Sequence, residues 1–260
     1  MTETTAQTTA GTPEPTPAVR DKGLFERIVG IIFSPRETFA AVAARPRTFP
    51  MLLVVILLVA LPTGWFMTTA VGRQAALDQA EKGLRFFSAF IPEEQMAQQR
   101  EQMATQYLEG SWVRVAGWPV ASIAVFTPVI FAIYAGLLML LRMLLGATAT
   151  FKQVFGVVVH SSVITAVATL FLTPLNYVRE SMDSATSLRV FLPMLDDGSF
   201  LASLLGSIDL FRVWWVIVLS IGLAVLFRRK TSTIAVTLFA VYGVIALGYA
   251  AVAAMFAARS

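Results

Sequence analysis

Five long apolar stretches constrain this chain more than any other feature of its sequence. An α-helix needs about 20 mostly apolar residues to cross about 30 Å of hydrocarbon, and stretches of about that length or more stand here. The runs are continuous rather than alternating, which favours helices over a β-barrel. The sequence therefore predicts an all-α, polytopic transmembrane helix bundle with five spans, at about 49–71, 117–145, 153–177, 210–227 and 232–257.

The composition supports a lipid environment. Apolar residues make up 57% of the chain and charged residues 14%, against about 45–50% and about 25% in soluble domains. A soluble protein of this length would have too little polar surface to cover so large an apolar core. Lipid is therefore expected to solvate part of the surface.

Charged residues between the spans predict the orientation. Three connections are basic: the approach to the first span (Arg45, Arg47), the turn between spans two and three (Arg142, Lys152), and the turn between spans four and five (Arg228, Arg229, Lys230). The other two connections hold more acidic than basic residues. By the positive-inside rule, the N-terminus is cytoplasmic and the C-terminus lies outside. These turns also account for the net charge of +4, so no nucleic-acid partner is expected.

Tryptophan placement supports the same orientation. Indole rings favour the headgroup level of a bilayer, where the ring is apolar and the N–H stays hydrated. All five are expected near the outer ends of spans one, two and four, namely Trp65, Trp112, Trp118, Trp214 and Trp215.

Three regions follow along the chain. Residues 1–20 lack the apolar core of a signal peptide and are expected to form a disordered cytoplasmic tail. Residues 21–47 are expected to form a pair of short amphipathic helices at the cytoplasmic leaflet, and 48–258 the membrane domain. Ser34-Pro35-Arg36-Glu37 has the form of a capping box at the start of the second helix. The pair is interpreted as an interfacial anchor, with a docking surface for a cytoplasmic protein over 21–44 as the alternative.

Several motifs resemble prokaryotic YIP1-family membrane proteins. They are Gly23-Leu24-Phe25-Glu26-Arg27 with Phe33-Ser34-Pro35, Phe151-Lys152-Gln153-Val154-Phe155, and Ser207-Ile208-Asp209-Leu210-Phe211-Arg212-Val213-Trp214 followed by Ile221-Gly222-Leu223. The resemblance implies five spans, a cytoplasmic N-terminus and an outer C-terminus, in a prokaryotic cell membrane. Eukaryotic relatives act in vesicle trafficking and associate with Rab-type GTPases. This chain lacks the long cytoplasmic N-terminal region of those relatives.

The sequence offers few residues for chemistry. It has one histidine and no cysteine, and no Gly-rich phosphate loop precedes a helix. We therefore predict no catalytic residues, no cofactor and no metal site, and we do not expect an enzyme.

Three residues are candidates for a functional role. His160 is an ionisable group within a span, and it either bonds a neighbouring helix or handles a proton or substrate. Asp209 is placed to cap the fourth span. Arg212 lies three residues further on, within reach of a salt bridge to Asp209. For this pair, structural capping and a ligand or partner contact are both open.

Small residues at helical spacing mark one face of the fifth span, beginning with Gly243, Ala246 and Ala250. Such a stripe lets another helix approach closely. That helix either belongs to the same chain or forms a homo-oligomer.

Two functions remain in competition. The leading hypothesis is a non-enzymatic membrane scaffold or adaptor, acting in membrane organisation or a trafficking-like process. The alternative is a small transporter, channel or lipid-moving protein with a polar bundle interior around His160. A polar cavity at mid-depth would favour transport, and a dry, close-packed bundle would favour the scaffold.

Overall fold

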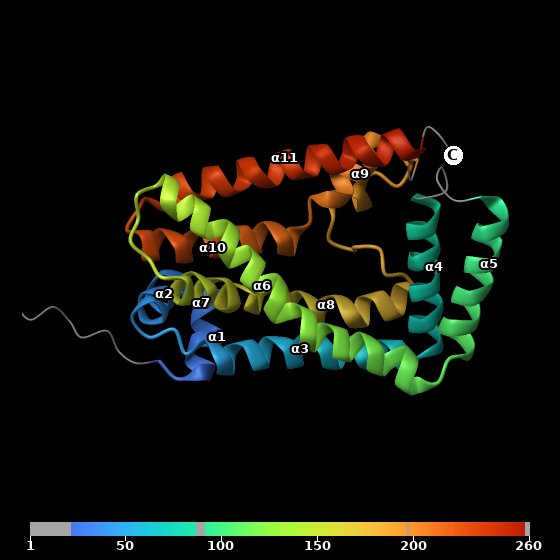
Figure 1. Cartoon of the computed structure of the whole chain (residues 1–260), viewed down its shortest axis with the longest axis horizontal. Coiled ribbons are helices and arrows are strands. Elements are labelled where there is room, and N and C mark those ends of the chain that lie inside the picture. The colour runs from blue at the N-terminus through green and yellow to red at the C-terminus, as the bar shows by residue number, and fades with distance from the viewer. Residues whose placement is uncertain (1–21, 87–91, 197, 258–260) are drawn as a thin grey trace, which may run out of the picture.

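The fold is all-helical over the residues that the computed structural model describes, namely 22–86, 92–196 and 198–257 (Figure 1). The predicted disordered tail, residues 1–20, lies outside them. The helices are α1 (Leu24–Phe33), α2 (Pro35–Ala44), α3 (Thr48–Thr68), α4 (Ala70–Phe86), α5 (Glu93–Ala104), α6 (Trp118–Leu144), α7 (Phe151–Ser161), α8 (Val163–Arg179), α9 (Phe200–Ser207), α10 (Leu210–Phe227) and α11 (Thr231–Ala257).

Five helical segments are long and apolar enough to cross a membrane, which confirms the predicted number. They are Thr48–Thr68, Val113–Leu144, Phe151–Arg179, Leu210–Phe227 and Thr231–Ala257. Two of them are composite. A π-helical turn, Val113–Gly117, leads into α6, and α7 continues into α8 through Ser162.

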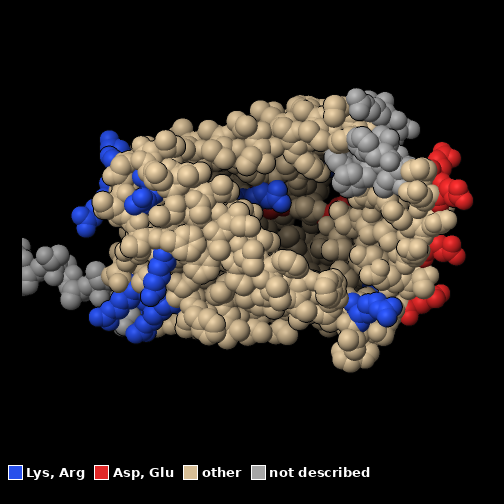
Figure 2. Space-filling view, viewed as in Figure 1, with Lys and Arg blue, Asp and Glu red and all other residues tan. Residues whose placement is uncertain are grey.

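The spans run along the long axis of the molecule, and charge separates toward its two ends (Figures 1 and 2). We call the end with α1, α2 and the turns at 145–150 and 228–230 the basic end, because Lys and Arg gather there. The acidic end carries α4 and α5, with Asp and Glu on its surface. The three basic connections thus share one end, as their charge pattern predicts.

The tryptophans divide into two groups. Trp65, at the end of α3, and Trp112 and Trp118, before and at the start of α6, are all exposed. Trp214 and Trp215 lie early in α10, and α10 begins well short of the acidic end (Figure 1). All five indoles thus lie near the ends of spans one, two and four, as the sequence predicts, although the start of α10 is set back from the acidic end (Figure 1).

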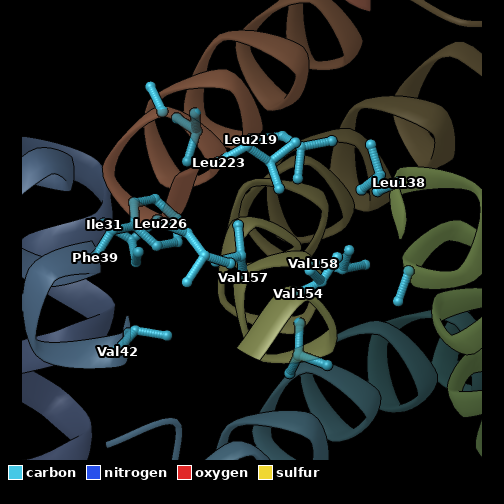
Figure 3. Close-up of a cluster of buried hydrophobic side chains, with 14 of the residues drawn as sticks. Ile31, Phe39, Val42, Leu138, Val154, Val157, Val158, Leu219, Leu223 and Leu226 are labelled. Carbon is cyan, nitrogen blue, oxygen red and sulfur yellow. The ribbon is translucent and has the colours of Figure 1, made fainter. Parts of the chain in front are cut away.

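The core residues belong to the parts of the helices nearer the basic end (Figure 1), and Figure 3 draws part of this cluster. Side chains of α7 form its centre, among them Val154, Val157 and Val158, and all three are fully buried. Leu223 of α10 and Phe39 of α2 close around them. The cluster continues into α3, α6, α8 and α11, so every span contributes to it.

The helix pair is built into this core, which its interfacial interpretation did not anticipate. Phe39 and Val42 of α2 are fully buried, and α2 packs against α7 and α10. Arg27 of α1 is 1% exposed and donates hydrogen bonds from Nε to the Lys22 carbonyl and from Nη1 to the Arg45 carbonyl, both 3.0 Å. A buried guanidinium thus ties the start of α1 to the end of α2.

The predicted capping box at Ser34 and Glu37 is wrong. Ser34 also ends α1, with its N–H bonded to the Gly30 carbonyl, and its backbone (φ −140°, ψ 56°) is unsuited to a side-chain cap. Glu37 instead forms an ion pair with Lys22 at 3.0 Å. The tight turn between the two helices therefore overrides the local capping signal.

The small-residue stripe of α11 is used within the chain. Ala246 and Ala250 are buried, and α11 packs against α9 and α10. The helices that the stripe contacts therefore belong to the same chain. Ala246 and Ala250, two of the three residues predicted for a homo-oligomer face with Gly243, are thus covered within the chain, and a homo-oligomer stays a prediction.

Gly222 lets α10 approach α7 and α2 closely in the core. A Cβ there would lie 2.6 Å from Cγ1 of Val157 and 2.9 Å from Cε1 of Phe39. We expect Gly222→Val to destabilise the protein by about 1–3 kcal/mol through overpacking. Its unfolding temperature in detergent should fall by several degrees. Gly248→Val is the matched control, since nothing lies within 4 Å of a Cβ at Gly248; equal effects of the two changes would contradict this packing.

Candidate polar site at the start of α10

The start of α10 is capped by a carboxylate. Oδ1 of Asp209 accepts hydrogen bonds from the backbone N–H groups of Phe211 (2.9 Å) and Arg212 (3.2 Å). The N-cap predicted for Asp209 is therefore confirmed. Such a cap satisfies N–H groups that are costly to leave open in an apolar setting.

The other carboxylate oxygen of Asp209 accepts hydrogen bonds from the connection that follows α8. Oδ2 accepts hydrogen bonds from the hydroxyls of Ser184 and Thr186, each at 2.5 Å. The two backbones also pair: Leu188 N–H donates to the Ile208 carbonyl at 2.9 Å, and Leu210 N–H to the Thr186 carbonyl at 3.1 Å. Asp209 thus joins the connection after α8 to the start of α10.

These hydrogen bonds and the burial of Asp209 together determine the pKa of its carboxyl group. Burial alone raises the pKa of the carboxyl group, but four hydrogen bonds oppose it, with those from Ser184 and Thr186 strongest. The net pKa is lowered from its ordinary value. Asp209 is therefore an anion at neutral pH whose two oxygens are both occupied by donors.

Arg212 lies beside this cap but does not pair with it. Its backbone N–H bonds Asp209, whereas its side chain is exposed. Among residues 22–86, 92–196 and 198–257, no hydrogen bond or ion pair to the Arg212 guanidinium is found. The salt bridge between Asp209 and Arg212 that their spacing allows is thus absent from the described part of the chain.

Aromatic side chains surround the first turns of α10. Phe211 contacts Phe171 of α8 and Trp214, with ring centroids 5.7 and 6.2 Å apart. Trp215 contacts Tyr134 of α6 at 5.9 Å. The site therefore combines one exposed cation with an aromatic neighbourhood.

His160 lies elsewhere, in the buried centre of the bundle. Its imidazole is fully buried in α7, and Nδ1 is 2.7 Å from the Gly156 carbonyl. An N–H at Nδ1 donates to that carbonyl, and Nε2 has no hydrogen-bond partner within the described ranges. No described hydrogen bond links His160 to Asp209 or Arg212.

The polar residues next to His160 do not form a pathway with it. The hydroxyls of Ser161, Ser162 and Ser220 each donate to a carbonyl four residues earlier in their own helix. All three residues are buried. Where the structure is described, no group of three or more His, Cys, Asp or Glu is placed to hold a metal ion.

Two parts of the site escaped sequence reasoning. Ser184 and Thr186 precede Asp209 by 25 and 23 residues, and no local pattern marks them. A Thr-x-x-Gln capping box at Thr150 and Gln153, by contrast, is visible in the sequence and begins α7 as that motif predicts.

The fold defines a polytopic helical membrane protein whose fourth span starts at a carboxylate cap. The family model described as the Yip1 domain matches residues 29–255, so the chain belongs to the Yip1 domain family. That match includes the whole of the polar site. No curated protein and no solved structure gives a significant match.

Two substitutions of Asp209 distinguish the contribution of its hydrogen-bonded cap from that of its negative charge. Asp209→Ala removes all four acceptor contacts, and we expect it to lower the free energy of unfolding by about 1 kcal/mol or more. Asp209→Asn keeps an amide oxygen for the cap and should retain most of the stability. Thermal unfolding in detergent measures both variants; an Asn variant as unstable as the Ala variant would contradict a capping role.

The stability difference between the wild type and Asp209→Asn is expected to depend on pH. Because the pKa of Asp209 is lowered in the folded state, its ionised form stabilises the fold above the ordinary carboxyl pKa of about 3.9, and that contribution is lost as pH falls through the folded pKa. The difference in unfolding temperature between wild type and Asp209→Asn should therefore be constant near neutrality and shrink under acid conditions. A difference that grows on acidification would exclude this linkage.

Proposed function

We propose that this protein is a non-enzymatic membrane scaffold that organises the bilayer through an interfacial helix held at its basic end. The observation that carries the proposal is the two-sided environment of α1. Its inner face is fixed in the protein by Arg27 and Ile31, which are 1% and 0% exposed. Its outer face is aromatic and open.

The outer face of α1 has the character of a surface that enters lipid. Phe25 and Phe33 are 78% and 79% exposed, and Val29 lies between them at the same helical spacing. Residues four apart lie on one face of a helix. Such a face, beside basic groups, is typical of helices that lie in the headgroup region.

Charge at the basic end favours a membrane surface with anionic lipids. Arg36 and Lys230 are exposed there, and Lys152 begins α7 nearby. Each cation near an anionic leaflet contributes about 1 kcal/mol of attraction. Apolar insertion and this attraction act together on the same end of the bundle.

We also infer that the basic end faces the cytoplasm of a prokaryotic cell, with the N-terminus inside and the C-terminus outside. The chain has no cysteine, so single-cysteine variants report position without background. In intact cells, a membrane-impermeant maleimide should label Glu101→Cys, at the acidic end, whereas Lys230→Cys should react only after permeabilisation. Labelling of both variants in intact cells, or of Lys230→Cys alone, would refute the orientation.

The depth of α1 is the second measurable consequence. A polarity-sensitive fluorophore at a Phe25→Cys or Phe33→Cys variant in vesicles containing phosphatidylglycerol should show a blue-shifted, lipid-quenchable emission. The same label on Phe191→Cys provides the matched control, because Phe191 is equally exposed, at 78%, but lies in the connection before α9. Water-like emission from both α1 sites would rule out an interfacial helix.

The scaffold role itself is tested in native membranes. Zero-length and lipid-soluble crosslinkers should produce discrete adducts of this chain, either with itself or with a second membrane or cytoplasmic protein docked at 21–44. We expect Phe25→Ser with Phe33→Ser to reduce them several-fold and Phe191→Ser to leave them unchanged. Recovery of no partner and no self-association would count against a scaffold.

A further inference from the structure

A hollow opens on the side of the molecule, beside the start of α10. Figure 2 shows it between the α9–α11 layer and α6, with basic atoms at its rim and acidic atoms within. The two long helices on either side make no extensive contact with one another: α6 packs against α3 and α7, and α11 against α9 and α10. The hollow therefore opens toward the bilayer.

Arg212 lies in the first turn of α10 and has no ion pair among the described residues. It belongs to a span by length and composition, Leu210–Phe227, and its side chain is exposed without a partner in the described ranges. Two carboxylates of the adjoining connection are already engaged: Asp209 accepts four hydrogen bonds, and Asp183 pairs with Lys82 at 2.7 Å. A cation within a span is costly unless an anion or water meets it.

We propose that the hollow binds one phospholipid, with the Arg212 guanidinium holding the lipid phosphate. Guanidinium and phosphate match in geometry, since two parallel N–H groups donate to two phosphate oxygens. The lipid reaches the site sideways from the leaflet, and no channel through the bundle is needed. This site is independent of the proposed scaffold role at the opposite end.

The surroundings fit the rest of such a ligand. The spans containing α6 and α11 are largely exposed, with 11% and 17% of their most apolar windows buried, so acyl chains find apolar walls on both sides. Phe171 is 54% exposed and Tyr134 42% exposed near the start of α10. An amphipathic ligand would therefore have its phosphate at Arg212 and its chains along the flanking helices.

Inorganic phosphate shares the headgroup chemistry, but the structure favours the lipid. A free anion would leave the lipid-facing sides of the hollow without an occupant, whereas a phospholipid covers both the cation and the apolar walls. The two sources differ in a measurable way, because only the lipid depends on acyl chains.

Native mass spectrometry of the full chain in detergent tests the site. Phosphatidylglycerol and diacylglycerol with the same acyl chains are titrated separately onto the wild type. We expect one phosphatidylglycerol to bind about tenfold more tightly than diacylglycerol, because only its phosphate can accept charge-assisted hydrogen bonds from the guanidinium. Equal binding of the two lipids to the wild type would overturn the proposal without any variant.

Substitutions of Arg212 test whether its guanidinium binds the lipid phosphate. Arg212→Gln should weaken phosphatidylglycerol binding about tenfold and leave diacylglycerol binding unchanged, and Arg212→Lys should lose less. Arg114→Gln is the matched control: it also removes an exposed arginine, but one in the turn before α6. Full retention of phosphatidylglycerol by Arg212→Gln, or a loss shared equally by Arg114→Gln, would refute the site. Displacement of the lipid by millimolar inorganic phosphate would assign it to the free anion instead.

Discussion

The enclosure of the third span by the other helices is the constraint on which the rest of the structure depends. Two thirds of the most apolar window of Phe151–Arg179 is buried inside the protein, whereas the buried share is smaller in each of the other four spans. Within a bilayer the hydrophobic effect does not drive helices together, so close packing has to do so. Valine side chains of α7 and the missing side chain at Gly222 supply that packing, and α2 is fixed through the same contact.

Polar groups in this bundle serve mainly to complete helices. Asp209 closes the start of α10, and Thr150 with Gln153 closes the start of α7. Buried hydroxyls return to carbonyls of their own helices, and His160 does the same through Nδ1. An ionisable residue such as His160 can therefore lie within a span without belonging to a proton or substrate pathway. Arg212 differs from these groups, because its guanidinium completes no helix end.

How far the sequence predicts this structure depends on the range of each interaction. Apolar length identifies all five spans, and Asp209 is recognised as a cap, because both are properties of neighbouring residues. The Ser34 box fails since the turn joining α1 to α2 fixes its backbone. The burial of Arg27 and the bonds from Ser184 and Thr186 to Asp209 link residues separated by 18 to 25 positions. Only the tertiary fold brings such groups together.

The two halves of the molecule differ in how tightly they are closed. Near the basic end, α1, α2, α7 and α10 share one core, and a buried arginine joins the helix pair to the connection before α3. Beyond the start of α10, the shorter fourth span leaves room that the connection from α8 to α10 occupies only in part (Figures 1 and 2). A closely packed half suits a fixed interfacial helix, and an open half suits a ligand that enters from the leaflet. Because α10 begins short of the acidic end, it completes the closely packed half and leaves the other half open (Figure 1).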